Sequence, residues 1–230
     1  MFGHNEVVGQ KFFREAPEAL ADKLLVTSVF HTIQGEGPYA GLPAVFVRLA
    51  KCQYACSFCD TYFDSGDWMD FGALLGRASA AGLDSGHAQA DLMVVTGGEP
   101  TLQQPTLGKF LAVFLRDPRH PSPFTRAQIE SNGLIPADVP DGTMVVVSPK
   151  CAEVGGRPRP YARLPAASLA RADCLKFVLR ADPASPYSAV PDWALEWRAS
   201  TGREVYVSPM AEYRRTPEQA RALYEARSAP

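Results

Sequence analysis

The residues Ala44-Val45-Phe46-Val47-Arg48-Leu49 form a short apolar run, and three cysteines follow it within ten positions. Such a run suits a strand that is buried on both faces of a parallel sheet. Five similar runs follow at 92–96, 127–130, 144–148, 175–179 and 204–208, and helical patterns lie at 71–80, 106–115 and 193–200. This alternation predicts an α/β fold. Six strands are too few for a closed eight-stranded barrel, so we expect an incomplete (β/α)6-type parallel barrel.

Length and composition indicate one domain that acts on a small molecule. The chain has 230 residues, and 46% of them are hydrophobic, which is enough for a sizeable single core. We expect a core over about 24–210 and a last helix and tail over 216–230, where Thr216, Pro217 and Gln219 form a helix start. With 23 basic and 25 acidic residues, the charge is nearly balanced, so we expect no nucleic acid and no membrane as partner.

The cysteines indicate a reducing compartment. Three of the five cysteines lie within eight positions, and the amino end shows no export signal, so metal ligation is favoured over disulfides. We therefore expect a cytoplasmic protein.

Polar and glycine-rich segments follow the expected strands where each strand ends. They are the cysteine segment 52–59, Gly97-Gly98-Glu99-Pro100, Ser131-Asn132-Gly133, Pro149-Lys150 and Pro209-Met210. Because the loops at the carboxyl ends of parallel strands converge, these segments are expected to face one ligand.

The cysteines Cys52, Cys56 and Cys59 have the spacing C-x3-C-x2-C. Three thiolates on one loop can ligate three irons of a [4Fe–4S] cubane and leave the fourth iron open for another ligand. A structural zinc site is the alternative, but it would want a fourth cysteine or histidine at regular spacing, and Cys151 and Cys174 are distant.

The segment Thr96-Gly97-Gly98-Glu99-Pro100 would let the polar head of a ligand approach the backbone and meet N–H donors. An isolated Gly-Gly pair is as often a tight turn. The segments Glu130-Ser131-Asn132-Gly133 and Ser148-Pro149-Lys150 are weaker signals, since each could be a turn or a helix cap.

Together, these motifs resemble those of the radical S-adenosylmethionine (SAM) superfamily. The segment Ile33-Gln34-Gly35-Glu36-Gly37, Arg48 before the cysteines and Asp60-Thr61 after them resemble the 7-carboxy-7-deazaguanine synthase family, over about residues 28–150. Lys51 and Gln53 depart from the Gly and Asn that are usual there.

The resemblance implies a lyase that converts 6-carboxy-5,6,7,8-tetrahydropterin to 7-carboxy-7-deazaguanine with loss of ammonia, in queuosine biosynthesis, the route to a modified tRNA base. It implies a barrel of the radical SAM kind, the cofactors [4Fe–4S], SAM and Mg²⁺, a homodimer and an electron donor such as flavodoxin. The alternatives are a glycyl-radical activase and a zinc-stabilised binding module.

The resemblance also assigns the site residues. The cluster falls to Cys52, Cys56 and Cys59, and Mg²⁺ to Thr61. The residues expected to bind SAM are Phe58, Cys59, Asp60, Gly98, Glu99, Ser131, Asn132, Ser148, Pro149 and Lys150. The residues expected to bind the pterin are Ile33, Gln34, Gly35, Glu36, Arg48, Thr96 and the terminal carboxylate of Pro230.

Overall fold

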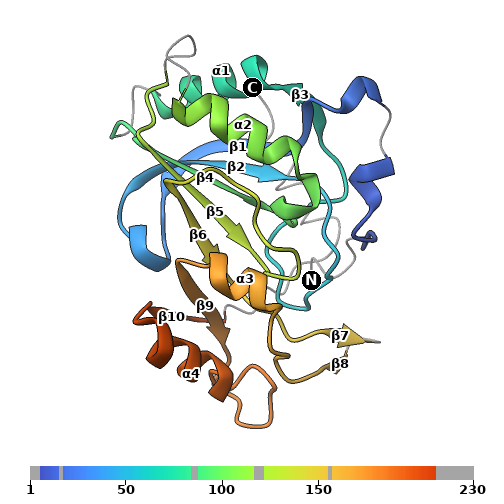
Figure 1. Ribbon diagram of the computed structural model, residues 1–230, viewed down its shortest axis with the longest axis vertical. Coiled ribbons are helices and arrows are strands. Elements are labelled where there is room, and N and C mark those ends of the chain that lie inside the picture. Colours follow the sequence, from blue (N-terminus) through green and yellow to red (C-terminus); the bar gives the residue numbers. More distant parts are fainter. Residues whose placement is uncertain (1–5, 16–17, 84–87, 117–121, 155–156, 211–230) are drawn as a thin grey trace.

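The computed structural model describes residues 6–15, 18–83, 88–116, 122–154 and 157–210. One mixed sheet of eight strands dominates this part of the chain, in the order β10-β9-β6-β5-β4-β2-β1-β3 (Figure 1). Neighbouring strands from β2 to β10 in this order are parallel. They are β2 (Pro43–Leu49), β4 (Leu92–Gly97), β5 (Arg126–Ser131), β6 (Thr143–Val147), β9 (Cys174–Leu179) and β10 (Val205–Pro209). The six expected runs therefore form the parallel part of the sheet, and the α/β class is confirmed.

Two further strands extend the sheet beyond β2, and sequence analysis missed both. The strand β1 (Lys23–Ile33) pairs antiparallel with β2, and β3 (Asp67–Asp70) pairs antiparallel with β1. Polar residues such as Thr27 and Ser28 interrupt the apolar pattern of β1, yet both are buried. The strand ends just before Gln34, so it places the Gln34-Gly35-Glu36 segment beside the parallel strands.

The longer helices lie where the sequence predicts them. They are α1 (Phe71–Gly82), α2 (Thr106–Arg116) and α4 (Asp192–Thr201); the six-residue α3 (Ala166–Arg171) was not expected. The carboxylate of Asp70 accepts a hydrogen bond from the Ala73 N–H at 2.8 Å and so caps the start of α1. In Figure 1, α1 and α2 lie together at one end of the molecule, and α3 and α4 lie at the β9–β10 end.

Short elements complete the described ranges. The 3₁₀ helices are η1 (Phe12–Glu15), η2 (Glu18–Leu20), η3 (Gly37–Tyr39) and η4 (Pro100–Gln103). The Pro- and Gly-rich sequence of residues 154–160 predicts a surface loop, but β7 (Glu153–Val154) and β8 (Arg157–Pro158) pair as a small antiparallel sheet. The expected last helix and tail, 216–230, lie outside the described residues.

The core lies between the sheet and the helices that pack on it. Leu74, Met93 and Phe110 are almost fully buried there. Trp197 of α4 is also buried, and its indole N–H donates to the Leu169 carbonyl of α3 at 3.2 Å. This tryptophan therefore packs on the core. Within the described ranges, none of the helices is long and apolar enough to cross a membrane.

Candidate active site

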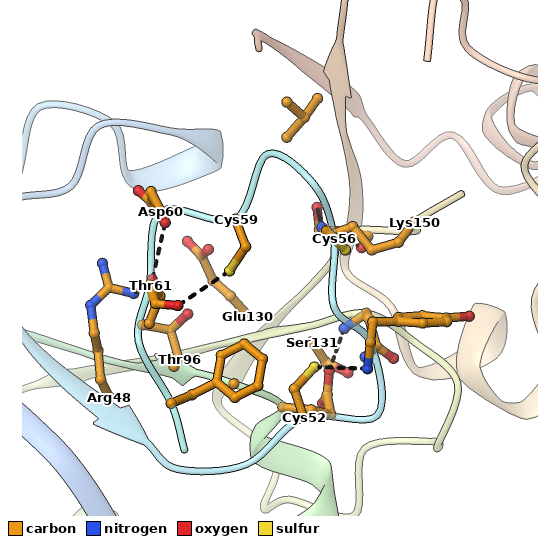
Figure 2. A pocket seen from close by; sticks show the side chains of 18 of the residues that line it. Arg48, Cys52, Cys56, Cys59, Asp60, Thr61, Thr96, Glu130, Ser131 and Lys150 are labelled. Atoms are coloured by element: carbon orange, nitrogen blue, oxygen red, sulfur yellow. Dashed lines mark hydrogen bonds between the residues drawn. The ribbon is translucent and has the colours of Figure 1, made fainter. Parts of the chain in front are cut away.

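A cavity of about 290 Å³ opens at the carboxyl ends of the parallel strands. It gathers most of the residues that the sequence assigned to cofactors and substrate (Figure 2). Those that line it are Gln34, Glu36, Arg48, Cys52, Cys56, Phe58, Cys59, Asp60, Thr61, Thr96, Gly98, Glu99, Ser131, Asn132, Ser148 and Lys150. The convergence of separate strand ends on one cavity explains why residues from position 34 to position 150 meet there.

Three of the assigned residues do not line this cavity, and one lies outside the described chain. Ile33 points away, with 63% of its surface exposed, because it ends β1. Gly35 and Pro149 also lie off the cavity wall, and Pro230 is not among the described residues.

The three motif cysteines line the cavity from the loop that follows β2 (Figure 2). Burial raises the pKa of the Cys56 thiol to about 11 and that of the Cys59 thiol to about 12. Burial, and then the neighbouring Glu99 carboxylate, raises the pKa of Cys52 as well. Without a cation these thiols therefore stay protonated at neutral pH, whereas bound iron would favour the thiolate.

The three motif cysteines are the thiol donors on the cavity wall among the described residues. Among the residues that the structure describes, no three side chains of His, Cys, Asp or Glu converge on one ion position. A structural zinc site needs four ligands around one ion, whereas the cysteines of a cubane each bind a different iron. Cys52, Cys56 and Cys59 are the residues of this cavity that could hold such a cluster.

The glycine pair at the end of β4 allows the cysteine loop to pack closely against this strand. A Cβ atom on Gly97 would overlap the backbone of Leu49, and one on Gly98 would overlap the carbonyl group of Lys51. The N–H of Gly98 donates to the Leu49 carbonyl and the N–H of Glu99 to the Lys51 carbonyl, both at 2.8 Å. Both of these N–H groups are therefore already paired with the backbone of the cysteine loop. The glycines permit close contact with the backbone of the loop.

The loop itself departs from ideal geometry at Lys51. This residue has φ of 71°, in the left-handed region that glycine adopts more easily. The preference for glycine at this position in the resembled family therefore has a backbone cause. The buried side-chain amide of Gln53 has no hydrogen-bond partner within the part of the chain that the structure describes.

Glu99 and Asn132 link the ends of β4 and β5. The buried Glu99 carboxylate accepts from the Asn132 N–H at 2.7 Å and from the Thr101 hydroxyl at 2.7 Å. Burial raises the pKa of Glu99, which these hydrogen bonds oppose. The Asn132 side-chain oxygen accepts from the Leu134 N–H at 3.0 Å, while its amide nitrogen is buried with no partner among the described residues. Because Asn132 lines the cavity, this orphaned donor is available to a ligand.

Arg48, Thr61 and Asp60 form a polar group on one wall of the cavity (Figure 2). Arg48 Nη1 donates to Thr61 Oγ1 at 2.7 Å, and that hydroxyl donates to Asp60 Oδ1 at 3.0 Å. A guanidinium, a hydroxyl and a carboxylate thus lie together. This combination suits an anionic group and a hard cation such as Mg²⁺.

The structure adds an ion-pair network around the buried Lys176, which sequence analysis missed. Lys176 of β9 also lines the cavity, and its Nζ lies 2.6 Å from Glu36 Oε2 and 2.8 Å from Glu130 Oε2. The amide nitrogens of Gln34 and Gln128 donate to Glu130 Oε1, each at 3.0 Å. Burial acts to lower the pKa of Lys176, but the two carboxylates outweigh it and raise that pKa.

The signal for Lys176 was a lysine inside an otherwise apolar strand, a placement that requires a partner. Other cavity residues that were not assigned are Phe46, Tyr54, Phe63, Gly97, Glu130, Val178 and Pro209. Several of these are apolar or aromatic, and no local sequence pattern distinguished them from core residues.

A polar cavity at the carboxyl ends of parallel strands is the arrangement of an α/β enzyme. No family model matches the chain. The 7-carboxy-7-deazaguanine synthase of Rickettsia prowazekii is 33% identical over 193 residues, which cover 84% of this chain and 74% of that protein. The synthase of the same name from Rhodospirillum rubrum is 32% identical over 227 residues, covering 93% and 83% respectively. The chain belongs to the 7-carboxy-7-deazaguanine synthase family.

The fold has a solved counterpart. The crystal structure of QueE from Escherichia coli matches with a TM-score of 0.53 at 23% identity, over 84% of this chain and 99% of that one. At this identity the match concerns the fold.

Proposed function

We propose that this enzyme converts 6-carboxy-5,6,7,8-tetrahydropterin to 7-carboxy-7-deazaguanine with loss of ammonia, as a step of 7-deazapurine and queuosine biosynthesis. One observation carries the proposal beyond family membership. The cavity brings the three motif cysteines together with Gln34, Glu36 and Arg48, residues suited to bind a pterin. The same cavity can therefore hold a radical source beside a polar, aromatic substrate.

The cofactors in this proposal are a [4Fe–4S] cluster on Cys52, Cys56 and Cys59 and SAM beside it. When bound, they supply the radical chemistry of the reaction. The orphaned Asn132 amide supports a ligand at this wall of the cavity, since it is a buried donor that no described residue satisfies. Lys150 donates to the carbonyl and the hydroxyl of Ser148 at 2.8 and 2.6 Å, so these two residues form one polar edge for the same ligand.

The segment Gln34-Gly35-Glu36 would recognise the pterin. Gln34 and Glu36 offer amide and carboxylate groups that match the amino and amide edge of a pterin. Lys176 fixes Glu36, and Glu130 fixes Gln34, so both side chains are oriented before substrate arrives. Preorganised groups of this kind hold a substrate in a productive position at lower entropic cost.

The substrate carboxylate would lie near Arg48 and Thr61. The guanidinium supplies positive charge, and Mg²⁺ held by the Thr61 hydroxyl would add more. Arg48 donates to the Thr61 hydroxyl oxygen at 2.7 Å and the hydroxyl donates to Asp60 at 3.0 Å, so the Thr61 side chain is held in place beside the guanidinium. Phe46 and Phe63, also on the cavity wall, would exclude water from the reacting ring.

The proposal also covers the type of barrel, the oligomeric state, the electron donor and the cellular compartment. We take the six parallel strands as the open, incomplete barrel of a radical SAM enzyme that forms a single domain over 1–230. A homodimer, an electron donor such as flavodoxin, and a place in the cytoplasm complete it.

The cofactor assignment is tested by anaerobic reconstitution with iron and sulfide. The proposal expects close to four irons per chain and their loss in Cys52→Ala, Cys56→Ala or Cys59→Ala. Cys151→Ala and Cys174→Ala should keep the iron of the wild type and, with SAM and the pterin, turn substrate over. A colourless chain that holds stoichiometric zinc would contradict the proposal.

A further inference from the structure

The turn at residues 56–59 of the cysteine loop is hydrogen-bonded to Glu153, which lies far along the chain. Ser57 lies between Cys56 and Cys59, and its N–H donates to Glu153 Oε1 at 2.9 Å. The Ser57 hydroxyl donates to the same oxygen at 3.0 Å. The Cys59 N–H closes the turn onto the Cys56 carbonyl at 3.0 Å. A single carboxylate oxygen from β7 therefore fixes the turn that carries two of the three cysteines.

Tyr187 holds this carboxylate in place. Its hydroxyl lies 3.2 Å from Glu153 Oε1 and 3.0 Å from the Cys151 carbonyl oxygen. The Tyr187 ring is buried, and it packs edge-on against Phe58 of the loop, with the ring centroids 5.1 Å apart. Glu153 is thus anchored from the core side, and Tyr187 contacts the same turn directly.

Glu153 also sets the charge beside the cysteines. Its carboxylate accepts both hydrogen bonds of Ser57, the residue directly after Cys56. A negative charge held at this position opposes the build-up of further negative charge on this part of the loop. Because Ser57 is exposed, solvent weakens the effect, so its size should be modest.

We propose that Glu153 is a positioning residue for the metal centre: it holds the turn at residues 56–59 and lowers the reduction potential of a cluster bound there. The potential of an iron–sulfur cluster depends on nearby charge and on hydrogen bonds around its sulfurs. A fixed carboxylate near the cysteines makes the extra electron less favourable. The inference rests on the proposed function, because it needs the three cysteines to hold a cluster.

The test compares reconstituted full-length Glu153→Gln, Glu153→Ala and Tyr187→Phe with the wild type. The readouts are midpoint potential from a redox titration and the rate of iron loss to a chelator. Glu153→Gln keeps an acceptor for Ser57 but removes the charge, so its potential should rise while iron loss stays within about twofold of wild type. Glu153→Ala should raise the potential and also lose iron roughly tenfold faster, since the turn loses its two hydrogen bonds. Tyr187→Phe should speed iron loss less than Glu153→Ala.

Glu196→Gln is the matched control. Glu196 pairs with Arg163 at 3.3 Å on the surface, so its loss should change neither readout. The inference would be overturned if both Glu153 variants had the midpoint potential and the rate of iron loss of the wild type. The proposed function would be unaffected by that result. A wild-type chain that holds no iron–sulfur cluster would overturn both.

Discussion

Lys176 Nζ lies 2.6 Å from Glu36 Oε2, although the two residues are 140 positions apart in the chain. This contact ties the middle of β9 to the segment after β1, across the cavity that holds the three cysteines. The ammonium of Lys176 also contacts Glu130, so one buried cation orients two carboxylates. The site therefore depends on a residue outside every motif that resembles the family.

We predict that Lys176→Met weakens both folding and pterin binding. Breaking the buried Lys176–Glu130 pair costs about 3–5 kcal/mol of unfolding free energy, and the half-exposed Glu36 adds little to that cost. The KM for pterin should rise more than the affinity for SAM falls, because Glu36 loses its orientation. Denaturant unfolding and steady-state kinetics measure the two effects.

Lys109→Met provides the comparison for this variant. Lys109 pairs with Asp22 at 2.9 Å, but both side chains are largely exposed. Its loss should cost less than about 1 kcal/mol. Equal stability losses in the two variants would contradict a special role for Lys176.

We predict that Gly98→Ala disrupts the seat of the cysteine loop. The added Cβ would meet the Lys51 carbonyl group, which is backbone and cannot rotate away. The variant should lose about 1–3 kcal/mol of stability and retain less iron after reconstitution. Gly76→Ala, in α1 with open space around the new Cβ, should instead gain about 0.5–1 kcal/mol. A Gly98→Ala chain as stable and as iron-rich as wild type would show that the loop does not need the close contact.

We predict that Thr61→Ala weakens dependence on Mg²⁺ more than it weakens SAM binding. The hydroxyl is a hard oxygen ligand, so its loss should lower Mg²⁺ affinity at least roughly tenfold. Thr61→Ser keeps the hydroxyl and should respond to Mg²⁺ as wild type does. Initial rates across a Mg²⁺ titration decide the matter. Equal stimulation of wild type and Thr61→Ala would remove Thr61 from the metal site.

We predict that the metal-free chain has an unusual pH dependence of thiol modification. An unperturbed Cys thiol has a pKa near 9.0, and burial raises that of Cys56 to about 11. The thiolate is the reactive form, so alkylation of Cys56 should keep accelerating from pH 9 to about pH 11 instead of levelling off near pH 9. The same shift means that the folded state holds this proton more tightly than the unfolded state. Its stabilising contribution is therefore complete below pH 9 and is lost as pH rises through that window.

Peptide mass spectrometry after timed iodoacetamide treatment gives the rate at Cys56. A rate that levels off near pH 9 would contradict the burial of this thiol.

Local sequence patterns predicted the parallel strands because each is buried on both faces and therefore reads as a continuous apolar run. The same logic failed for β1, whose buried Thr27 and Ser28 look like surface residues when read locally. The helix α3 was missed because six residues are too few to show a helical period. Turn residues between strands predicted a loop at 154–160, where β7 and β8 pair instead.

The cavity wall was predictable where chemistry is encoded locally, as in Cys52, Cys56 and Cys59. It was not predictable where a side chain acts through a distant partner. Lys176 meets Glu130 because β9 lies two strands from β5 in the same sheet, and it meets Glu36 because the segment after β1 lies against β9. The close approach of Gly98 to the Lys51 carbonyl was not predictable for the same reason, since the two residues lie on different loops.

The central claim is the reaction itself, and product analysis tests it most directly. The chain is reconstituted anaerobically, reduced, and incubated with SAM, Mg²⁺ and 6-carboxy-5,6,7,8-tetrahydropterin, and the products are quantified by mass spectrometry together with released ammonia. We predict that wild type and Cys174→Ala each form one ammonia for every 7-carboxy-7-deazaguanine. Cys56→Ala should form neither product. Full iron content with the pterin recovered unchanged would contradict the claim.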